Sequence, residues 1–212
     1  ENGNILSKIY LEAAAEAGYE INNDMNGYKQ EGFGLMDTTI FDGKRQSTSV
    51  TYLHPIKQRQ NLTLITNVQV SKIIIENSSA VGVEINNKNR LEKIFAEKEV
   101  LLSAGAINSP QILMLSGVGP EEELKNHGIN VISALNGVGE NLQDHLETYV
   151  QYECTKPVTL YSSFNPINMA LIGLQWFLFK KGIAAHSNLE IGGFIRTNEM
   201  VDYPNMQYHF FP

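Results

Sequence analysis

The stretch VLLSAGAINSPQILMLSGVGP, residues 100–120, decides the fold. An apolar run ends at the small residues SAGA (103–106), and a second apolar run opens at Ser109-Pro110. An uninterrupted apolar run is typical of a central strand in a parallel sheet, so we expect such a strand at 100–103. A helix over 109–115 should follow it, with the proline in its first turn. Because ligands bind at the carboxyl ends of strands in open α/β sheets, the small residues indicate either a ligand against the backbone or a tight turn packed on protein.

Upstream of this stretch the apolar residues follow a period of two. Short β-branched runs separated by Asn, Ser and Gly predict an antiparallel meander. The runs are LTLIT (62–66), VQVSKIII (68–75), AVGVEI (80–85) and a strand near 91–95.

Hydrophobic periodicity and residues that end helices also predict the helices, strands and loops in the rest of the chain. We expect a helix at 3–17, a loop at 22–44, a helix within 46–58, a helix at 120–127, a polar loop at 136–145, strands at 146–154, 189–196 and 205–212, and a helix at 166–181. The sequence opens inside a helix and ends on a strand, so we expect an internal piece of a longer protein.

Composition excludes several classes of protein. The 212 residues are 42% hydrophobic and 18% charged, which are globular values. A net charge of −7 argues against a nucleic-acid partner, whose binding needs clustered Lys and Arg. The single cysteine, Cys154, excludes an internal disulfide, and we expect a buried thiol. No metal-ligand spacing is present, and the most apolar segment, 169–179, is too short for a membrane span.

GAINSPQILMLSGVG (105–119) resembles the second signature of the glucose-methanol-choline (GMC) oxidoreductases, which are flavin-dependent alcohol and sugar oxidases and dehydrogenases. Other stretches resemble the family in the same order along the chain. They are GKRQSTSVTYLHPIKQRQNLTLITNVQVSKII (43–74), AVGVE (80–84), GVGENLQDH (137–145), LEIGGFIRT (189–197) and YPNMQYHFFP (203–212). The insect glucose-dehydrogenase-like branch is the one that the chain resembles most.

The resemblance implies an α/β (mixed α+β) fold. It implies the central part of a doubly wound FAD-binding domain and part of an antiparallel-sheet substrate domain. Residues 1–54 would join these two parts, 55–145 would belong to the FAD-binding domain, and 146–212 to the substrate domain. The family's G-x-G-x-x-G unit and its catalytic His are expected before Glu1 and after Pro212, so no catalytic residue is predicted in this chain.

The resemblance also implies FAD as cofactor, with contacts at Val70, Ala104, Gly105, Asn141 and Asp144. At Val70 the backbone N–H and C=O would match the donor and acceptor of the adenine edge, and the alternative is a plain core valine. At Ala104 and Gly105 small side chains would let the cofactor approach the backbone. Asn141 and Asp144 would either shape the flavin site or satisfy N–H groups of their own loop.

The activity implied is oxidation of a CH–OH group in a small alcohol or sugar, with hydride transfer from the carbinol carbon to the flavin. The chain alone is expected to be inactive. A catalytically silent relative that serves as a binding or structural protein is the alternative, and an NAD-dependent dehydrogenase is disfavoured because the fingerprint is not seen. The sequence leaves the substrate and the oligomeric state open. Glycosylation sequons at Asn61 and Asn77 favour secretion.

Overall fold

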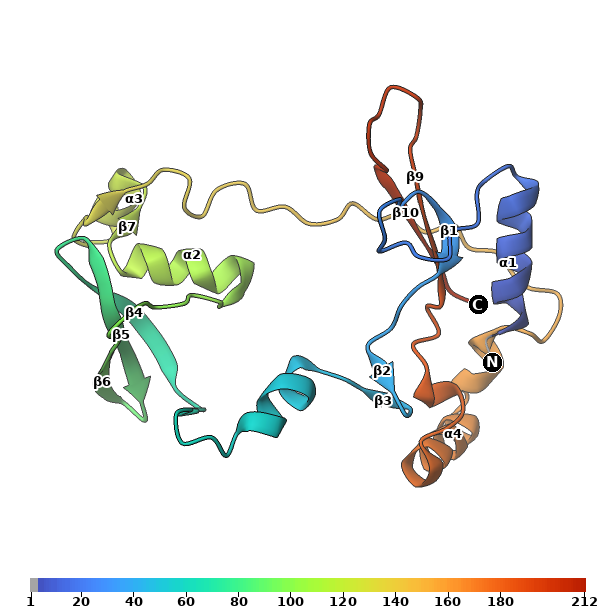
Figure 1. The fold of residues 1–212 in the computed structure, drawn as a ribbon, viewed down its shortest axis with the longest axis horizontal. Helices are drawn as coiled ribbons and strands as arrows, with labels where there is room; N and C mark the ends of the chain where they lie inside the picture. Colours follow the sequence, from blue (N-terminus) through green and yellow to red (C-terminus); the bar gives the residue numbers. More distant parts are fainter. Residues whose placement is uncertain (1–3) are drawn as a thin grey trace. The chain divides into compact units, whose positions relative to one another are not determined.

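The computed structural model describes residues 4–212, and its chain forms two compact units. Unit 1 combines the residues up to Arg59 with Val150–Pro212, and unit 2 is Gln60–Tyr149. In Figure 1 unit 2 contains the green and yellow elements, and unit 1 contains the dark blue, orange and red ones. Each unit has helices and sheets, so the predicted mixed α/β class is confirmed.

A three-stranded antiparallel meander forms the sheet of unit 2. Its strands are β4 (Gln69–Glu76), β5 (Ser79–Asn87) and β6 (Arg90–Phe95), in that spatial order. Both hairpins turn on two residues with positive φ, Asn77-Ser78 (49° and 62°) and Lys88-Asn89 (51° and 65°). Positive φ at both central residues matches the twist of the flanking strands. The predicted meander is confirmed from residue 69 onward, but the strand predicted at 62–66 is not formed.

A helical segment follows the meander in unit 2. Its elements are α2 (Gly105–Leu115), β7 (Val118–Gly119), α3 (Glu121–Asn126) and β8 (Ser133–Ala134), with β7 and β8 paired in parallel. Helix α2 packs on β4, and Leu124 of α3 is 1% exposed. Helix α2 begins four residues earlier than predicted, which places Pro110 inside the helix rather than in its first turn.

Two predicted strands are absent for lack of a partner strand. Residues 100–103 pair with no other strand, and Leu101 is 80% exposed. Residues 146–154 are likewise unpaired, and Cys154 is exposed rather than buried. An apolar or alternating run becomes a strand only when a neighbour accepts its backbone hydrogen bonds. Among residues 4–212 neither run has such a neighbour, so the prediction of a central parallel strand at 100–103 was wrong.

The sheet of unit 1 brings together both ends of the chain. Strand β9 (Ile191–Ile195) lies between β1 (Gly32–Leu35) and β10 (Met206–Phe210), antiparallel to both. Because β1 falls within residues 22–44, the loop predicted there was wrong in part. Helix α1 (Ile5–Glu16) covers this sheet, and a core cluster forms from Ala14, Phe33 and Ile195. The predicted helix at 3–17 is confirmed over Ile5–Glu16, and its first residue lies outside the described residues. The strands predicted at 189–196 and 205–212 are confirmed in position.

The close approach of Phe33 to β9 depends on a glycine. A Cβ on Gly193 would lie 2.4 Å from the Phe33 ring, so only glycine lets the ring cross the strand. The ring also contacts Tyr10, Tyr19 and Tyr208, with centroid distances of 6.0, 5.1 and 5.5 Å. Such aromatic pairs stabilise a core beyond the area they bury.

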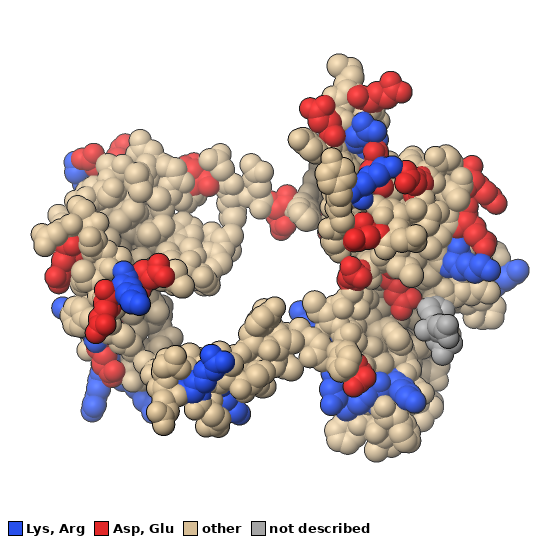
Figure 2. Space-filling view, in the orientation of Figure 1, with Lys and Arg blue, Asp and Glu red and all other residues tan. Residues whose placement is uncertain are grey.

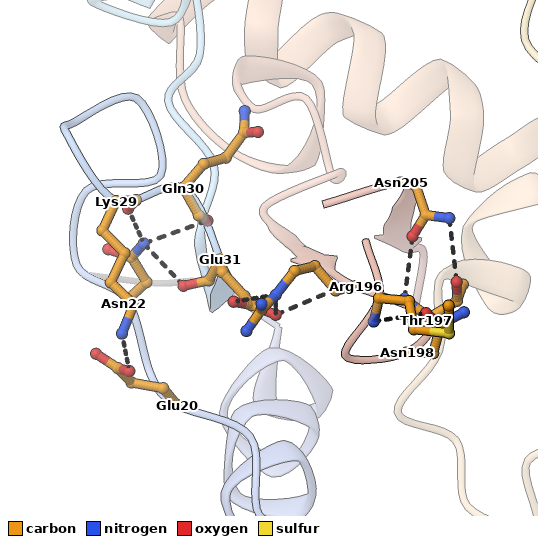
Figure 3. Close-up of polar contacts among 10 residues, drawn as sticks. Glu20, Asn22, Lys29, Gln30, Glu31, Arg196, Thr197, Asn198 and Asn205 are labelled. Carbon is orange, nitrogen blue, oxygen red and sulfur yellow. Dashed lines mark hydrogen bonds and ion pairs between the residues drawn. The ribbon is translucent and has the colours of Figure 1, made fainter. Parts of the chain in front are cut away.

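Polar contacts close the ends of this sheet (Figure 3). The Arg196 side chain, just after β9, donates from Nε to both carboxylate oxygens of Glu31 at 3.1 Å, and its backbone N–H donates to the same carboxylate at 3.2 Å. Asn205 joins Thr197 through two bonds of 3.0 Å. These contacts hold β1 and β10 in register against β9.

The remaining elements of unit 1 are short apart from one helix. They are the hairpin β2 (Ile40–Phe41) and β3 (Lys44–Arg45), a π-helical turn (Ser49–Leu53) continued by a 3₁₀ turn (His54–Ile56), further 3₁₀ turns (Leu160–Phe164 and Ile183–Ala185), and α4 (Pro166–Phe179). Trp176 of α4 donates to the Gly43 carbonyl at 2.6 Å, which ties the helix to the hairpin. No helix in residues 4–212 combines the length and hydropathy needed to cross a bilayer.

Charges of both signs are interspersed on the molecular face in Figure 2. No continuous field of Lys and Arg appears on that face. On α3, Lys125 forms an ion pair with Glu121.

Candidate cofactor site

All five residues predicted to contact the cofactor lie in unit 2. Val70 is on β4, Ala104 and Gly105 are at the start of α2, and Asn141 and Asp144 are in the loop after β8. Helix α2 contacts β4, so the first two locations belong to one packed structure. Within the described part of the chain, Asn141 and Asp144 form no hydrogen bond with the other three residues.

The backbone of Val70 faces the free edge of the sheet. Ile73 lies opposite Val83 of β5, but its N–H points away from β5 and donates to Ser116 Oγ at 2.8 Å. Ile73 and Val83 are therefore a pair that exchanges no backbone hydrogen bonds. Val83 therefore directs its own N–H and C=O toward β6, and so does Ile85 two residues later. Val70 pairs with Ile85, so its N–H and C=O point away from β5.

A β-bulge makes this orientation possible. Residues three apart on a regular strand direct their backbone groups to opposite sides. The register shifts by one residue between Val70 and Lys72, so that Val70 and Ile73 both face the edge. Bulges of this kind commonly stand beside functional sites. The geometry therefore supplies the donor and acceptor that an adenine edge needs, and Val70, which is half-buried, is not a fully enclosed core valine.

The start of α2 is open and lacks a side-chain cap. Ala104 occupies the N-cap position with no side-chain hydrogen bond to the helix, and its own N–H donates to Ser109 Oγ at 3.1 Å. Gly105 has φ +87°, a conformation that favours glycine, and a Cβ there would meet no atom within 4 Å. A large planar or anionic group could approach this backbone without a clash, which fits the predicted role of Ala104 and Gly105.

The loop after β8 leaves both of its predicted roles open. Asn141 adopts φ 56°, a left-handed conformation that asparagine tolerates. The Asp144 carboxylate accepts the N–H of His145 at 2.8 Å, which is the local satisfaction of loop backbone that the sequence offered as an alternative. His145 is exposed.

Sequence reasoning missed Ser116. Its side chain is buried, at 5% exposure, and bonds both Ile73 of β4 and Ile112 of α2. The available signal was a serine directly before Gly117 at the end of an apolar helix, where a hydroxyl can bond backbone groups. A shallow hollow of about 260 Å³ opens beside it, lined by residues that include Ile73, Ser116 and Asn130. No group of three or more His, Cys, Asp or Glu side chains gathers as a metal site within residues 4–212.

Comparison with known proteins identifies the family of this chain. Residues 1–147 match the sequence profile of the family described as GMC oxidoreductase. The chain belongs to the GMC oxidoreductase family. FAD is thereby confirmed as the cofactor to expect, because the family and a matching solved structure are FAD-dependent. The family resemblance read from residues 105–119 is confirmed as well.

Two relatives that are similar over almost the whole chain are choline dehydrogenases. The chain is 50% identical to human mitochondrial choline dehydrogenase over 207 residues, which is 98% of this chain and 35% of the relative. It is 50% identical over 213 residues to oxygen-dependent choline dehydrogenase 1 of Chromohalobacter salexigens, covering 100% of this chain and 38% of the relative. The chain thus spans little more than a third of the length of these relatives.

A solved structure shares the fold. The FAD-dependent oxidoreductase of Chaetomium thermophilum matches with a TM-score of 0.75 and 28% identity. The match covers 91% of this chain and 35% of that one.

Proposed function

We propose that this chain is part of an FAD-dependent oxidoreductase that oxidises the alcohol group of choline or a closely related amino alcohol. The observation that carries the proposal is 50% identity to choline dehydrogenase over 98% of the chain. The glucose-dehydrogenase-like branch expected from the motifs finds no support among the relatives reported above. The coarser expectation of a small-molecule alcohol substrate agrees with them.

The residues of unit 2 would bind FAD mainly through its adenine and pyrophosphate groups, which take no part in the reaction. The Val70 N–H would donate to adenine, and its C=O would accept from the adenine amino group. The first N–H groups of α2, beyond Gly105, have no intrahelical partner and favour negative charge, so they suit a pyrophosphate or a polarised flavin oxygen. Asn141 and Asp144 would shape the neighbouring wall of the site.

FAD, when bound, would supply the redox chemistry of the alcohol oxidation. This chain contributes binding and orientation. The edge of β4 and the start of α2 belong to one packed structure, so they fix two separate parts of an extended ligand at once. No catalytic base is assigned to residues 4–212, and the Asp144 carboxylate already accepts a local N–H.

The test is a substrate comparison with the complete protein that carries this chain. The purified protein is supplied with an artificial electron acceptor, and kcat/KM is measured for choline, glucose and a simple primary alcohol. We expect choline to exceed glucose by at least about tenfold, because a site built around one substrate rejects analogues that leave its groups unpaired.

Two other outcomes would redirect the proposal. A higher kcat/KM for glucose would favour the sugar-oxidising branch. A protein that binds FAD and oxidises none of the three would favour the catalytically silent relative. Running the assay with and without oxygen separates an oxidase from a dehydrogenase in the same experiment.

A further inference from the structure

The hydroxyl of Ser116 joins the two halves of the candidate cofactor site. Ser116 is the C-cap residue of α2 and is 5% exposed. Its Oγ accepts the Ile73 N–H at 2.8 Å and donates to the Ile112 carbonyl at 2.5 Å. A hydroxyl has one proton to donate, and the Ile112 bond takes it, so the oxygen's lone pairs are left to face β4.

This bond is made on the same free edge that carries Val70. Ile73 lies three residues after Val70, and the bulge between Val70 and Lys72 turns both backbones to that side. The Ser116 hydroxyl occupies the edge at Ile73, whereas the groups of Val70 remain directed outward from the sheet. The C-terminal end of α2 is therefore hydrogen-bonded to β4 at Ile73, three residues after the predicted adenine contact at Val70.

The other end of the same helix carries Ala104 and Gly105. Helix α2 has 11 residues, so its two ends are about 16 Å apart. The helix is continuous over Gly105–Leu115, with Pro110 inside it, so it links its two ends directly. Fixing its C-terminal end to Ile73 fixes where its open N-terminal end stands relative to Val70.

We propose that Ser116 is a positioning residue for FAD binding. Through its bond to Ile73 it sets the spacing between the edge of β4 at Val70 and the start of α2 at Gly105. An extended cofactor that contacts both places binds tightly only when that spacing is right. This inference rests on the proposed function, in which unit 2 holds FAD.

The test compares Ser116→Ala with wild type in the complete protein. The dissociation constant of FAD is measured by titrating the apoprotein, and the melting temperature is measured with and without FAD. Alanine leaves the Ile73 N–H without its acceptor, and we expect the FAD dissociation constant to rise about tenfold. Ser116→Thr keeps the hydroxyl and should restore most of the affinity. Ser133→Ala, an exposed serine on β8 of the same unit, is the matched control and should leave the affinity unchanged.

The two melting temperatures separate positioning from simple stabilisation. If Ser116 only stabilises unit 2, Ser116→Ala lowers both melting temperatures equally and leaves the FAD dissociation constant within about twofold of wild type, which would overturn the inference. A wild-type protein that binds no FAD overturns the proposed function and this inference with it. If Ser116→Ala does not fold, Ser116→Cys retains a weak acceptor of similar size, and we expect a smaller rise of about threefold.

Discussion

The sheets of the two units are assembled in opposite ways. In unit 2, β4, β5 and β6 are neighbours in sequence and are joined by two-residue turns. In unit 1, β9 pairs with β1 from the other end of the chain, with Gly32 opposite Phe194. The unit 1 sheet places its aromatic residues against α1, whereas β4 turns backbone groups outward along a free edge. The comparison shows a long-range sheet that carries the aromatic core of unit 1 and a local sheet whose outer strand leaves backbone groups unpaired, and only the second offers an edge to the proposed ligand.

The largest expected effect is on the core of unit 1. Phe33→Ala removes a ring that is 4% exposed and contacts Tyr10, Tyr19 and Tyr208. We expect a loss of about 3–5 kcal/mol in the free energy of unfolding, measured by urea denaturation of the complete protein. Phe95→Ala on β6, where the ring is 64% exposed, is the control and should cost less than about 1 kcal/mol. Equal losses for the two variants would contradict the distinction between the sheets.

The second prediction concerns the binding edge. Val70→Pro removes one backbone N–H that points away from β5, and proline is tolerated at such edge positions. We expect the FAD dissociation constant to rise at least about tenfold, because adenine loses its donor and the opposing acceptor stays unpaired.

The matched control for that variant is Leu91→Pro on the other edge strand of the same sheet. Leu91 pairs with Asn86, whose backbone faces β4, so the Leu91 N–H also points outward. This variant should bind FAD like wild type. If both proline variants lose FAD equally, the cause is damage to the sheet rather than loss of a contact at Val70.

A smaller effect is expected at the start of α2. Gly105→Ala places a Cβ in open space but forces an L-residue into φ +87°, at a cost of about 1–2 kcal/mol in stability. Relaxation of that strain would move the backbone that approaches the cofactor and weaken FAD binding by several-fold. Gly137→Ala has equally open space without positive φ and should change neither quantity. Fluorescence titration measures the affinity for FAD, and thermal melting measures the stability. Equal values for Gly105→Ala and Gly137→Ala would contradict the role assigned to Gly105.

The smallest expected effect is the pH dependence of the stability that the Glu31–Arg196 contact gives to unit 1. The hydrogen bonds from Arg196 hold the pKa of Glu31 below its ordinary value of 4.5. A lowered pKa in the folded state stabilises the protein above the ordinary value, and this contribution is lost as the pH falls through the lowered pKa. Glu31→Gln should therefore be slightly less stable than wild type at pH 7, and the difference should vanish in acid. Melting temperatures between pH 7 and pH 3 check this, and a difference that grows in acid would contradict it.

Local patterns predicted the local structure well. The period-two runs of residues 68–95 and the apolar helices at 3–17 and 166–181 match observed elements, because their signals lie within one hairpin or one helix. The prediction of strands at 62–66, 100–103 and 146–154 was wrong, because a strand also needs a partner that no local pattern reveals. For the same reason β1 was predicted as loop, although its short run GFGL pairs fully with β9.

The residues of the candidate site were chosen from the sequence and stay a prediction, whereas the contacts that arrange them could not be predicted from it. The run of small residues indicated an open backbone at Ala104 and Gly105, and the structure places Gly105 in a conformation that favours glycine. Neither the bulge that turns Val70 outward nor the Ser116 bond to Ile73 leaves a periodic signal, because both depend on register between β4 and its neighbours. These two features carry the site geometry, and they became visible only in three dimensions.

The most direct measurement is a crystal structure of the complete protein with bound FAD. We predict that the Val70 backbone nitrogen and carbonyl oxygen each lie within about 2.7–3.2 Å of an adenine nitrogen. We also expect Gly105 to contact the cofactor while the Ser116–Ile73 bond stays intact. Adenine bound elsewhere, with the edge of β4 covered by protein or solvent, would contradict the central claim that this edge is the binding surface of the chain.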